Sequence, residues 1–217
     1  MVEHIHPDPT RNETVVAENV SFDDFLILYA EQHAEWLMGK VILIMPNNTP
    51  HQRIQMFLGT LINMFLNVAG LGEILSAGTP MHISDNQPAR EPDLMVVLLQ
   101  NRGRIQERWL EGPADIAVEI VSPESTIRDR GDKFIEYQLG GVKEYWLLDP
   151  VHQDADFWTL GPDGSYVPRP QDAQGRISSG VLPGFALDPD ILWDDENLIH
   201  VNINQLLQEM LENRTHG

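Results

Sequence analysis

The stretch DIAVEIVSPESTIRDRGDKFIEYQLGGVKEYWLLDP, residues 115–150, decides the fold. Its two ends, 115–121 and 142–150, are short apolar runs bounded by proline or glycine, which is typical of buried strands. Between them the pattern predicts a helix over 127–139, capped by Thr126 and ended by paired glycines. A strand–helix–strand unit with short connections predicts a crossover between two roughly parallel strands. The chain is therefore expected to have an α/β fold.

Helices and strands are also predicted outside this unit. The predicted helices cover 21–33, 50–68 with Thr49 as its cap, a short stretch around 105–110, and 204–212. The predicted strands form a hairpin over 35–45, short runs at 73–76, 81–83 and 92–99, and a second hairpin of 155–160 with 165–168. We expect an N-terminal arm over 1–20, one domain over 21–195 and a helical tail over 196–217.

Two acidic residues occupy positions from which strand burial should exclude them. Asp93 opens the apolar run 92–99, and Glu119 interrupts the run 115–121. An unpaired buried carboxylate costs several kcal/mol or becomes neutral. Alone, Glu119 could be a structural acid bonded to an arginine or to backbone amides, and Asp93 could cap its own turn. Together, on neighbouring strands, they suggest a shared divalent cation, and oxygen ligands suit Mg²⁺ or Mn²⁺.

The helix predicted after Glu119 offers a cation for the same place. Asp129 and Lys133 are four residues apart and share a face of this helix, which Tyr137 continues. One interpretation is an exposed ion pair of little energetic value. The other is that Lys133 faces the strand acids, where its ammonium would orient the attacking water or stabilise charge on the phosphate.

Two further residues are candidate auxiliary groups. His51, at the start of the helix predicted over 50–68, could contact an anion or a metal, or could be a half-exposed residue of the helix end. Glu35 could join the site or could pair with Lys40 across its hairpin. The other histidines lack the spacing of zinc sites.

The bulk composition limits the function classes. The chain of 217 residues has 33 acidic and 14 basic residues, a net charge of −19, and no cysteine. This charge argues against tight non-specific DNA binding by the chain alone, although it leaves room for a metal-neutralised site. No apolar run approaches the roughly 20 residues needed to span a bilayer, and the first residues do not resemble a secretory signal. We therefore expect a cytoplasmic protein without a membrane partner.

The chain resembles the Uma-type restriction endonuclease family in four stretches: EPDLMVV at 91–97, ADIAVEIVSPEST at 114–126, RDRGDK at 128–133 with Tyr137, and GVKEYWLLDP at 141–150. Weaker similarity is found at Glu35, Gly39, His51 and the sequence GVLPGF at 180–185. The resemblance, over roughly 20–195, implies the PD-(D/E)XK nuclease-like superfamily. It implies a restriction-endonuclease-like α/β core, a central mixed sheet flanked by helices, and Mg²⁺-dependent hydrolysis of DNA phosphodiester bonds. Asp93 then matches the acid of the Pro–Asp motif, and Glu119 matches the acid of the later strand.

The sequence departs from the superfamily pattern in two places. The lysine expected two residues after Glu119 is replaced by Val121, so Lys133 in the following helix would have to serve instead. The helix predicted over 50–68 carries no acid, and His51, Gln52 or Glu35 would have to stand in. These departures keep a second hypothesis open, a nuclease fold retained as an inactive binding or regulatory module. For an active enzyme we expect a homodimer, because cutting a duplex needs two active sites.

Overall fold

The computed structural model describes residues 14–44, 48–122, 125–126, 128–194 and 198–216. Its two main sheets each have six strands, and the one with the longer strands is called the larger sheet. The strand order of the larger sheet is β12-β11-β10-β9-β7-β4. Its strands are β4 (Gly72–Ser76), β7 (Leu94–Leu98), β9 (Ile116–Ile120), β10 (Glu144–Asp149), β11 (Asp154–Leu160) and β12 (Tyr166–Pro168). β9 and β10 are parallel and their other neighbours are antiparallel, so the central sheet is mixed.

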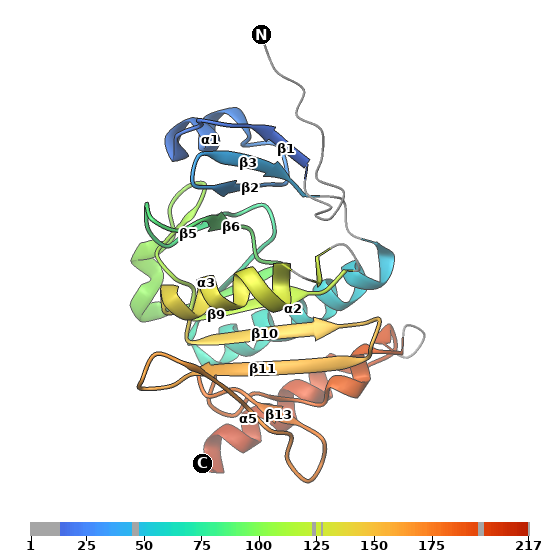
Figure 1. Cartoon of the computed structure of the whole chain (residues 1–217). Coiled ribbons are helices and arrows are strands. Elements are labelled where there is room, and N and C mark those ends of the chain that lie inside the picture. The colour runs from blue at the N-terminus through green and yellow to red at the C-terminus, as the bar shows by residue number, and fades with distance from the viewer. Residues whose placement is uncertain (1–13, 45–47, 123–124, 127, 195–197, 217) are drawn as a thin grey trace.

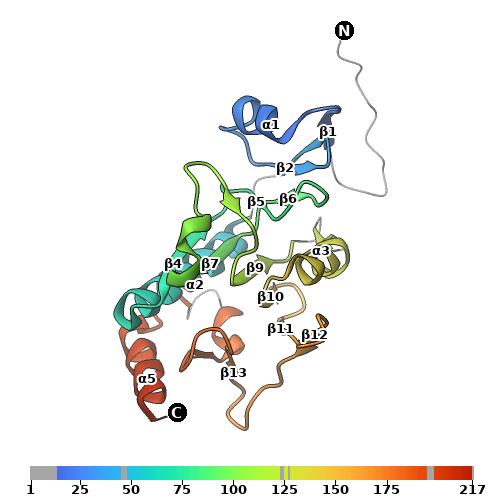
Figure 2. The same ribbon diagram turned by 90° about the vertical axis from the view of Figure 1, so that its left-hand side faces the viewer.

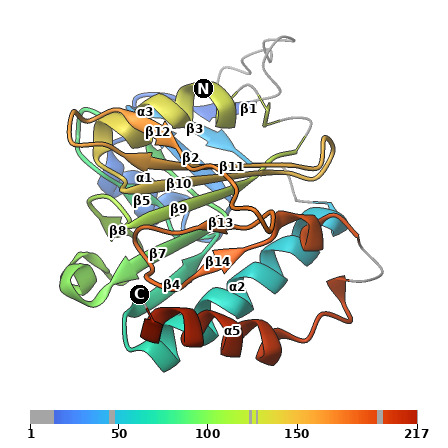
Figure 3. The same ribbon diagram turned by 90° about the horizontal axis from the view of Figure 1, so that it is seen from below.

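Helices cover both faces of this sheet. α2 (Thr49–Ala69) and α5 (Ile203–His216) lie side by side in Figure 3 and contribute to an apolar cluster with Ile116, Val118 and Ile120 of β9. On the opposite face Ala117 packs in a second cluster that includes Tyr137 of α3 (Lys133–Gly140). Side chains along β9 therefore alternate between the two faces of the sheet, and Glu119 belongs to the face covered by α3.

A smaller sheet with the order β1-β3-β2-β6-β5-β8 stands at the other end of the molecule from α5 (Figures 1 and 2). Its strands are β1 (Thr14–Ala17), β2 (Ala34–Leu37), β3 (Lys40–Leu43), β5 (Met81–His82), β6 (Ala89–Arg90) and β8 (Leu110–Glu111). The short helix α1 (Phe22–Leu28) packs on it through the buried Phe25. This sheet brings β2 and β6 over the end of the larger sheet, where the candidate site lies.

The remaining short elements complete the chain. They are the 3₁₀ helices η1 (Leu99–Arg104) and η3 (Pro189–Leu192), the π-helical turn η2 (Arg128–Asp132), and the small hairpin of β13 (Ile177–Ser178) and β14 (Ala186–Leu187). None of the helices in the described part of the chain is long and apolar enough to cross a membrane.

The strand–helix–strand prediction is confirmed by the parallel pairing of β9 with β10 across α3. Three local predictions away from the candidate site differ from the structure. The helix predicted around 105–110 is absent, because Ile105 and Leu110 instead pair as a β-bridge. Residues 14–17 of the expected N-terminal arm form β1 and pair with β3, while 1–13 lie outside the described residues. The helix predicted over 21–33 ends at Leu28.

Candidate active site

Asp93 and Glu119 reach the same place from two antiparallel strands. Asp93 directly precedes β7, and Glu119 is the fourth residue of β9. The backbone N–H of Ile120 donates to Asp93 Oδ2 at 2.7 Å, so the Asp93 carboxylate lies against the residue next to Glu119. Both acids line a cavity of about 560 Å³. The predicted convergence of the two strand acids is therefore present in the structure.

Lys133, the first residue of α3, points its ammonium into a group of carboxylates. Its Nζ lies 2.8 Å from Glu119 Oε1, 3.3 Å from Glu35 Oε1 and 3.4 Å from Asp129 Oδ1. The side chain is only 3% exposed, so the interpretation of Asp129 and Lys133 as an exposed ion pair is wrong. Burial opposes the charged form, but Glu119, Glu35 and Asp129 outweigh it and raise the pKa of Lys133. The lysine is therefore a permanent cation at neutral pH.

The turn before Lys133 is wider than the predicted α-helix. Residues Arg128–Asp132 form the π-helical turn η2, a conformation that is frequent at functional sites. The hydroxyl of Thr126 donates to the carbonyl of Ser122 at 3.0 Å, where a helix cap was predicted. The Tyr145 hydroxyl donates to the carbonyl of Asp129 at 3.0 Å. This turn places Arg128 and Asp129 on the cavity wall, whereas Asp132 is exposed.

Glu35 reaches the site from the smaller sheet. Its predicted alternative partner, Lys40, instead pairs with Glu18. Glu35 Oε2 accepts from Arg90 at 2.7 Å, and Arg90 makes two further bonds to Glu136 of α3. Burial opposes ionisation of Glu35, but Lys133 and then Arg90 outweigh it and lower its pKa well below the ordinary value. Glu35 is therefore a charged part of the site and joins β2 to α3.

His51 is buried beneath Asp93, so the half-exposed position considered for it is wrong. Its Nε2 lies 3.1 Å from Asp93 Oδ2, and Gln55 on the next turn of α2 donates to the Asp93 carbonyl at 2.9 Å. α2 begins at Thr49 with Asn48 as its cap, because the Asn48 side chain accepts from the backbone N–H of His51. Thr49 was predicted as the cap, one residue too late.

Sequence reasoning missed several residues of the site. They are Arg90, Glu136, Arg128, Gln55 and Asn48. The one available signal was that buried Glu35, Glu119 and Asp93 need more positive charge than Lys133 provides. Arg90 could have been suspected on this ground, because it precedes the Pro–Asp motif closely.

Glu119 is a carboxylate whose charged form burial disfavours. Burial raises its pKa to about 8; Lys133 opposes this rise, while Asp129 and Asp93 add to it. The Tyr137 hydroxyl donates to Glu119 Oε1 at 2.7 Å, on the oxygen that also contacts Lys133. A further cation beside Glu119 would therefore favour its ionised form.

The raised pKa of Glu119 predicts a pH-dependent stability. The pKa of Glu119 is about 8 in the folded protein against an ordinary 4.5. The stabilising contribution of this group to the free energy of unfolding is therefore full below about pH 4.5 and is lost as the pH rises to about 8. In EDTA, the free energy of unfolding should fall over this window more steeply for the natural protein than for the Glu119→Gln variant. Urea titrations at several pH values measure both slopes. Parallel curves would contradict the pKa assignment.

Replacing Tyr137 by phenylalanine tests the contact with Glu119. The variant loses one buried hydrogen bond but keeps the aromatic packing of α3 against Tyr145. We expect any nuclease activity to fall about 10-fold to 100-fold, as when the partner of a functional carboxylate is removed. Initial cleavage rates measure this, and Tyr166→Phe is the matched control, because its buried hydroxyl donates to the Val142 carbonyl at 2.9 Å and does not line the cavity as far as the structure describes it. Equal losses in both variants would indicate a general effect on packing.

The fold and the site together define a class of protein, the α/β nuclease-like proteins with a central mixed sheet and a strand-borne acid pair. The structure is similar to a crystal structure described as "a putative nuclease belonging to DUF820" from Anabaena variabilis. The TM-score is 0.66 at 19% sequence identity, over 80% of this chain and 97% of the other. Since the identity is low, this likeness concerns the fold.

The chain belongs to the Uma2 family, described as "Putative restriction endonuclease", whose sequence model matches residues 22–190. This membership supports a nuclease function at the level of the family. Among curated proteins, no match to the chain was found.

Proposed function

We propose that the protein is a divalent-metal-dependent endonuclease that hydrolyses phosphodiester bonds of DNA at Asp93, Glu119 and Lys133. One observation carries this proposal. The acid before β7, the acid of β9 and the lysine of α3 line a single cavity, with Lys133 Nζ 2.8 Å from Glu119 Oε1. The lysine comes from a helix, and its ammonium would stabilise the charge of a phosphate bound beside the two acids. Val121, two residues after Glu119, packs in the apolar cluster under α3.

The donor set fits Mg²⁺ or Mn²⁺. Within the described ranges no three acidic or histidine side chains form a complete metal cage. Mg²⁺ is usually held by one or two carboxylates together with water and substrate phosphate, so a pair of acids suffices. Asp93 and Glu119 would hold the ion, and a cation bound there would favour the ionised form of Glu119, whose pKa is raised by burial and then by Asp129 and Asp93. When bound, the metal would supply an activated water and polarise the phosphoryl oxygen.

The chain's own residues would hold the two acids in position and stabilise the negative charge of the phosphate. Lys133, fixed as a cation by three carboxylates, would stabilise negative charge that develops on the phosphate and is unsuited to accept a proton. His51 and Gln55 would hold Asp93 in place through its carboxylate and its backbone carbonyl. Tyr137 would fix the orientation of Glu119.

A net charge of −19 means that DNA has to be attracted locally. Arg128 and Lys133 bring positive charge to the cavity wall, and a metal ion would add to it. We also propose that the enzyme acts as a homodimer in the cytoplasm, because cleavage of both strands of a duplex requires two copies of this site.

Metal-stimulated cleavage tests the proposed function. Supercoiled plasmid DNA incubated with the protein should be nicked or linearised in Mg²⁺ or Mn²⁺ and remain intact in EDTA. Calorimetry with Mn²⁺ should show binding to the natural protein that is lost in the Asp93→Asn variant. If neither cleavage nor metal binding occurs, the inactive binding module is the better assignment.

A further inference from the structure

We propose that His33 is a catalytic residue that donates the proton to the leaving oxygen, and that Glu91 holds its imidazole in place. This inference rests on the proposed phosphodiester hydrolysis and extends it. Neither residue belongs to the group around Asp93, Glu119 and Lys133, yet both line the same cavity.

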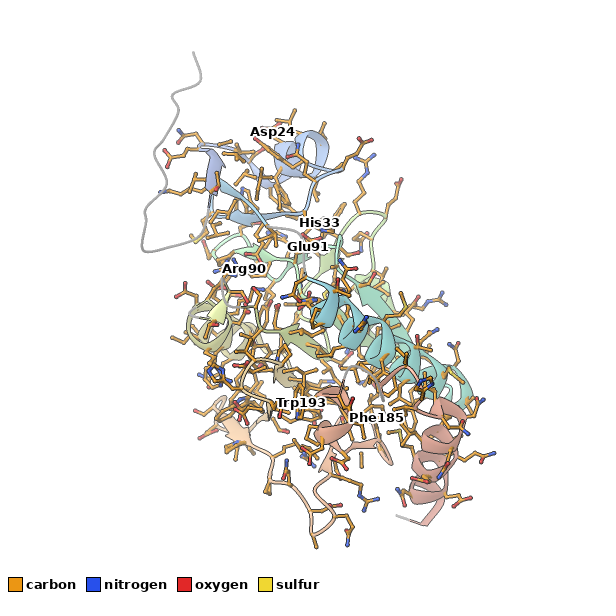
Figure 4. All side chains as sticks on the ribbon, turned by 90° about the vertical axis from the view of Figure 1, so that its right-hand side faces the viewer. Asp24, His33, Arg90, Glu91, Phe185 and Trp193 are labelled. Atoms are coloured by element: carbon orange, nitrogen blue, oxygen red, sulfur yellow. The ribbon has the colours of Figure 1, made fainter. Side chains whose placement is uncertain are left out.

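The two side chains form a defined pair at the edge of the cavity. His33, directly before β2, has Nδ1 3.2 Å from Glu91 Oε1. The Glu91 side chain is 4% exposed, whereas that of His33 is 65% exposed. In Figure 4 they lie together between the smaller sheet and the rest of the molecule, with Arg90 nearby. A buried carboxylate therefore orients an imidazole whose other nitrogen, Nε2, is left for a substrate.

Glu91 is itself fixed to the site. Its backbone N–H donates to Glu35 Oε1 at 3.4 Å, and it stands two residues before Asp93 in the chain. Glu35 is in turn held by Arg90 and Lys133. The His33–Glu91 pair is therefore connected through Glu35 and Lys133 to Glu119 of the acid pair. A substrate phosphate held near Asp93 would lie in the same cavity that His33 borders.

The other candidates for a proton donor are less suitable. Lys133 is buried and its Nζ is held by three carboxylates at 2.8 to 3.4 Å. The Tyr137 hydroxyl is buried and already donates a hydrogen bond to Glu119 Oε1 at 2.7 Å. His51 is buried with Nε2 against Asp93. Among the described residues that line the cavity, His33 is the histidine with access to solvent, from which it can recover a proton after each turnover.

The chemistry requires such a donor. When water attacks, its oxygen forms a bond to phosphorus and one of its protons passes to the solvent, while the bond from phosphorus to the leaving oxygen breaks and its electron pair remains on that oxygen. Protonated His33 would give its Nε2 proton to this oxygen, so that an alcohol leaves and the imidazole becomes neutral. Glu91 would stabilise the charged imidazole before the transfer. General acid catalysis of this kind contributes about 10²-fold to 10⁴-fold in rate.

A substrate with a better leaving group tests this role. Product ends from unmodified DNA first establish the cleavage position and the oxygen that leaves. An oligonucleotide duplex is then made in which sulfur replaces that bridging oxygen, because a thiolate leaves without a proton. His33→Gln should cleave the oxygen substrate about 10²-fold to 10⁴-fold more slowly than the natural protein. It should cleave the sulfur substrate at a rate close to that of the natural protein.

Two further variants sharpen the test. Glu91→Gln should show a smaller loss that the sulfur substrate also rescues, which a merely structural defect would not allow. His152→Gln is the matched control: its side chain is 72% exposed and its Nδ1 lies 2.9 Å from Asp149 Oδ2, but it is outside the cavity. It should cleave both substrates normally.

Three outcomes overturn the inference. In the first, His33→Gln cleaves the oxygen substrate at the natural rate; in the second, its cleavage rate falls equally for both substrates. In either case His33 is not the proton donor, while the endonuclease assignment stands. If the natural protein cleaves neither substrate in Mg²⁺ or Mn²⁺, the proposed function fails and the inference fails with it.

Discussion

Replacing Asp93 by asparagine or Glu119 by glutamine is expected to lower metal-dependent DNA cleavage by about 10³-fold, comparable to the loss of a principal charge-stabilising group. Each change removes one negative charge from a proposed metal ligand and preserves the shape of the side chain. Initial rates on plasmid DNA in Mg²⁺ and in Mn²⁺ measure the effect. The loss should persist at saturating metal, because each variant lacks a ligand that the bound ion needs.

Both variants should remain folded. The asparagine side-chain oxygen at position 93 can still accept the hydrogen bond from the Ile120 backbone, which measures 2.7 Å to Asp93. Glu119→Gln mimics the neutral form that burial already favours, since the pKa of Glu119 is raised to about 8. Thermal unfolding in EDTA checks this point, so that a loss of activity cannot be attributed to a loss of structure.

Asp149→Asn is the matched control for this pair. Asp149 is also a buried acid of the larger sheet, at the end of β10, but it pairs with Arg130 and is not among the residues of the cavity wall. Its variant should keep cleavage within a few-fold of the natural rate, whatever its effect on stability. Cleavage at the natural rate by both Asp93→Asn and Glu119→Gln would remove the basis of the proposed active site.

The strand acids were predictable from the sequence because burial makes a charge conspicuous. Asp93 and Glu119 stand in short apolar runs, where an uncompensated carboxylate would cost several kcal/mol. Lys133 and Tyr137 followed from the four-residue spacing that places side chains on one helix face. The crossover between β9 and β10 followed from the short connections of the unit. These inferences each depend on local pattern and on one physical constraint.

Contacts between distant segments were not predictable in the same way. Arg90 meets Glu35 across 55 positions of sequence, and the pairing arises because the smaller sheet folds over the end of the larger one. Nothing in the hairpin around Glu35 distinguishes that partner from Lys40, which is much closer in the chain. The local pattern favoured the near partner, and the tertiary arrangement supplied the distant one.

Local competition explains the misplaced elements. Asn48 and Thr49 can both cap a helix, and the structure uses the asparagine. A π-helical turn such as Arg128–Asp132 has no established signature in a single sequence, so an ordinary α-helix was predicted from residue 127. That turn matters to the site, because it ends directly at Lys133 and leads the lysine toward the strand acids. The unusual origin of the lysine thus depends on the element that sequence reasoning missed.

Lys133→Met should be the most destabilising single change in the site. The variant leaves Glu35, Glu119 and Asp129 buried without their shared ammonium, which lies between 2.8 and 3.4 Å from each of them. Breaking a buried ion pair by removing one partner costs about 3–5 kcal/mol. Urea unfolding in EDTA at pH 8 should show a loss of this size. At pH 5.5 the loss should be smaller, because Glu119 can take up a proton and shed its charge.

Two further variants test whether the loss comes from unpaired charge. Adding Glu119→Gln to Lys133→Met should restore part of the stability, because one of the three buried carboxylates that lost the ammonium is then replaced by a neutral amide. Lys143→Met is the control: Lys143 Nζ lies 2.7 Å from Asp115 Oδ1, but its side chain is 46% exposed. Asp115 also keeps its bonds from Leu98 and Asn101, so this loss should stay within about 1 kcal/mol. If Lys133→Met were equally destabilised at both pH values and unaffected by the second change, lost packing would explain the effect, and Lys133 would not be the cation that holds the acids together.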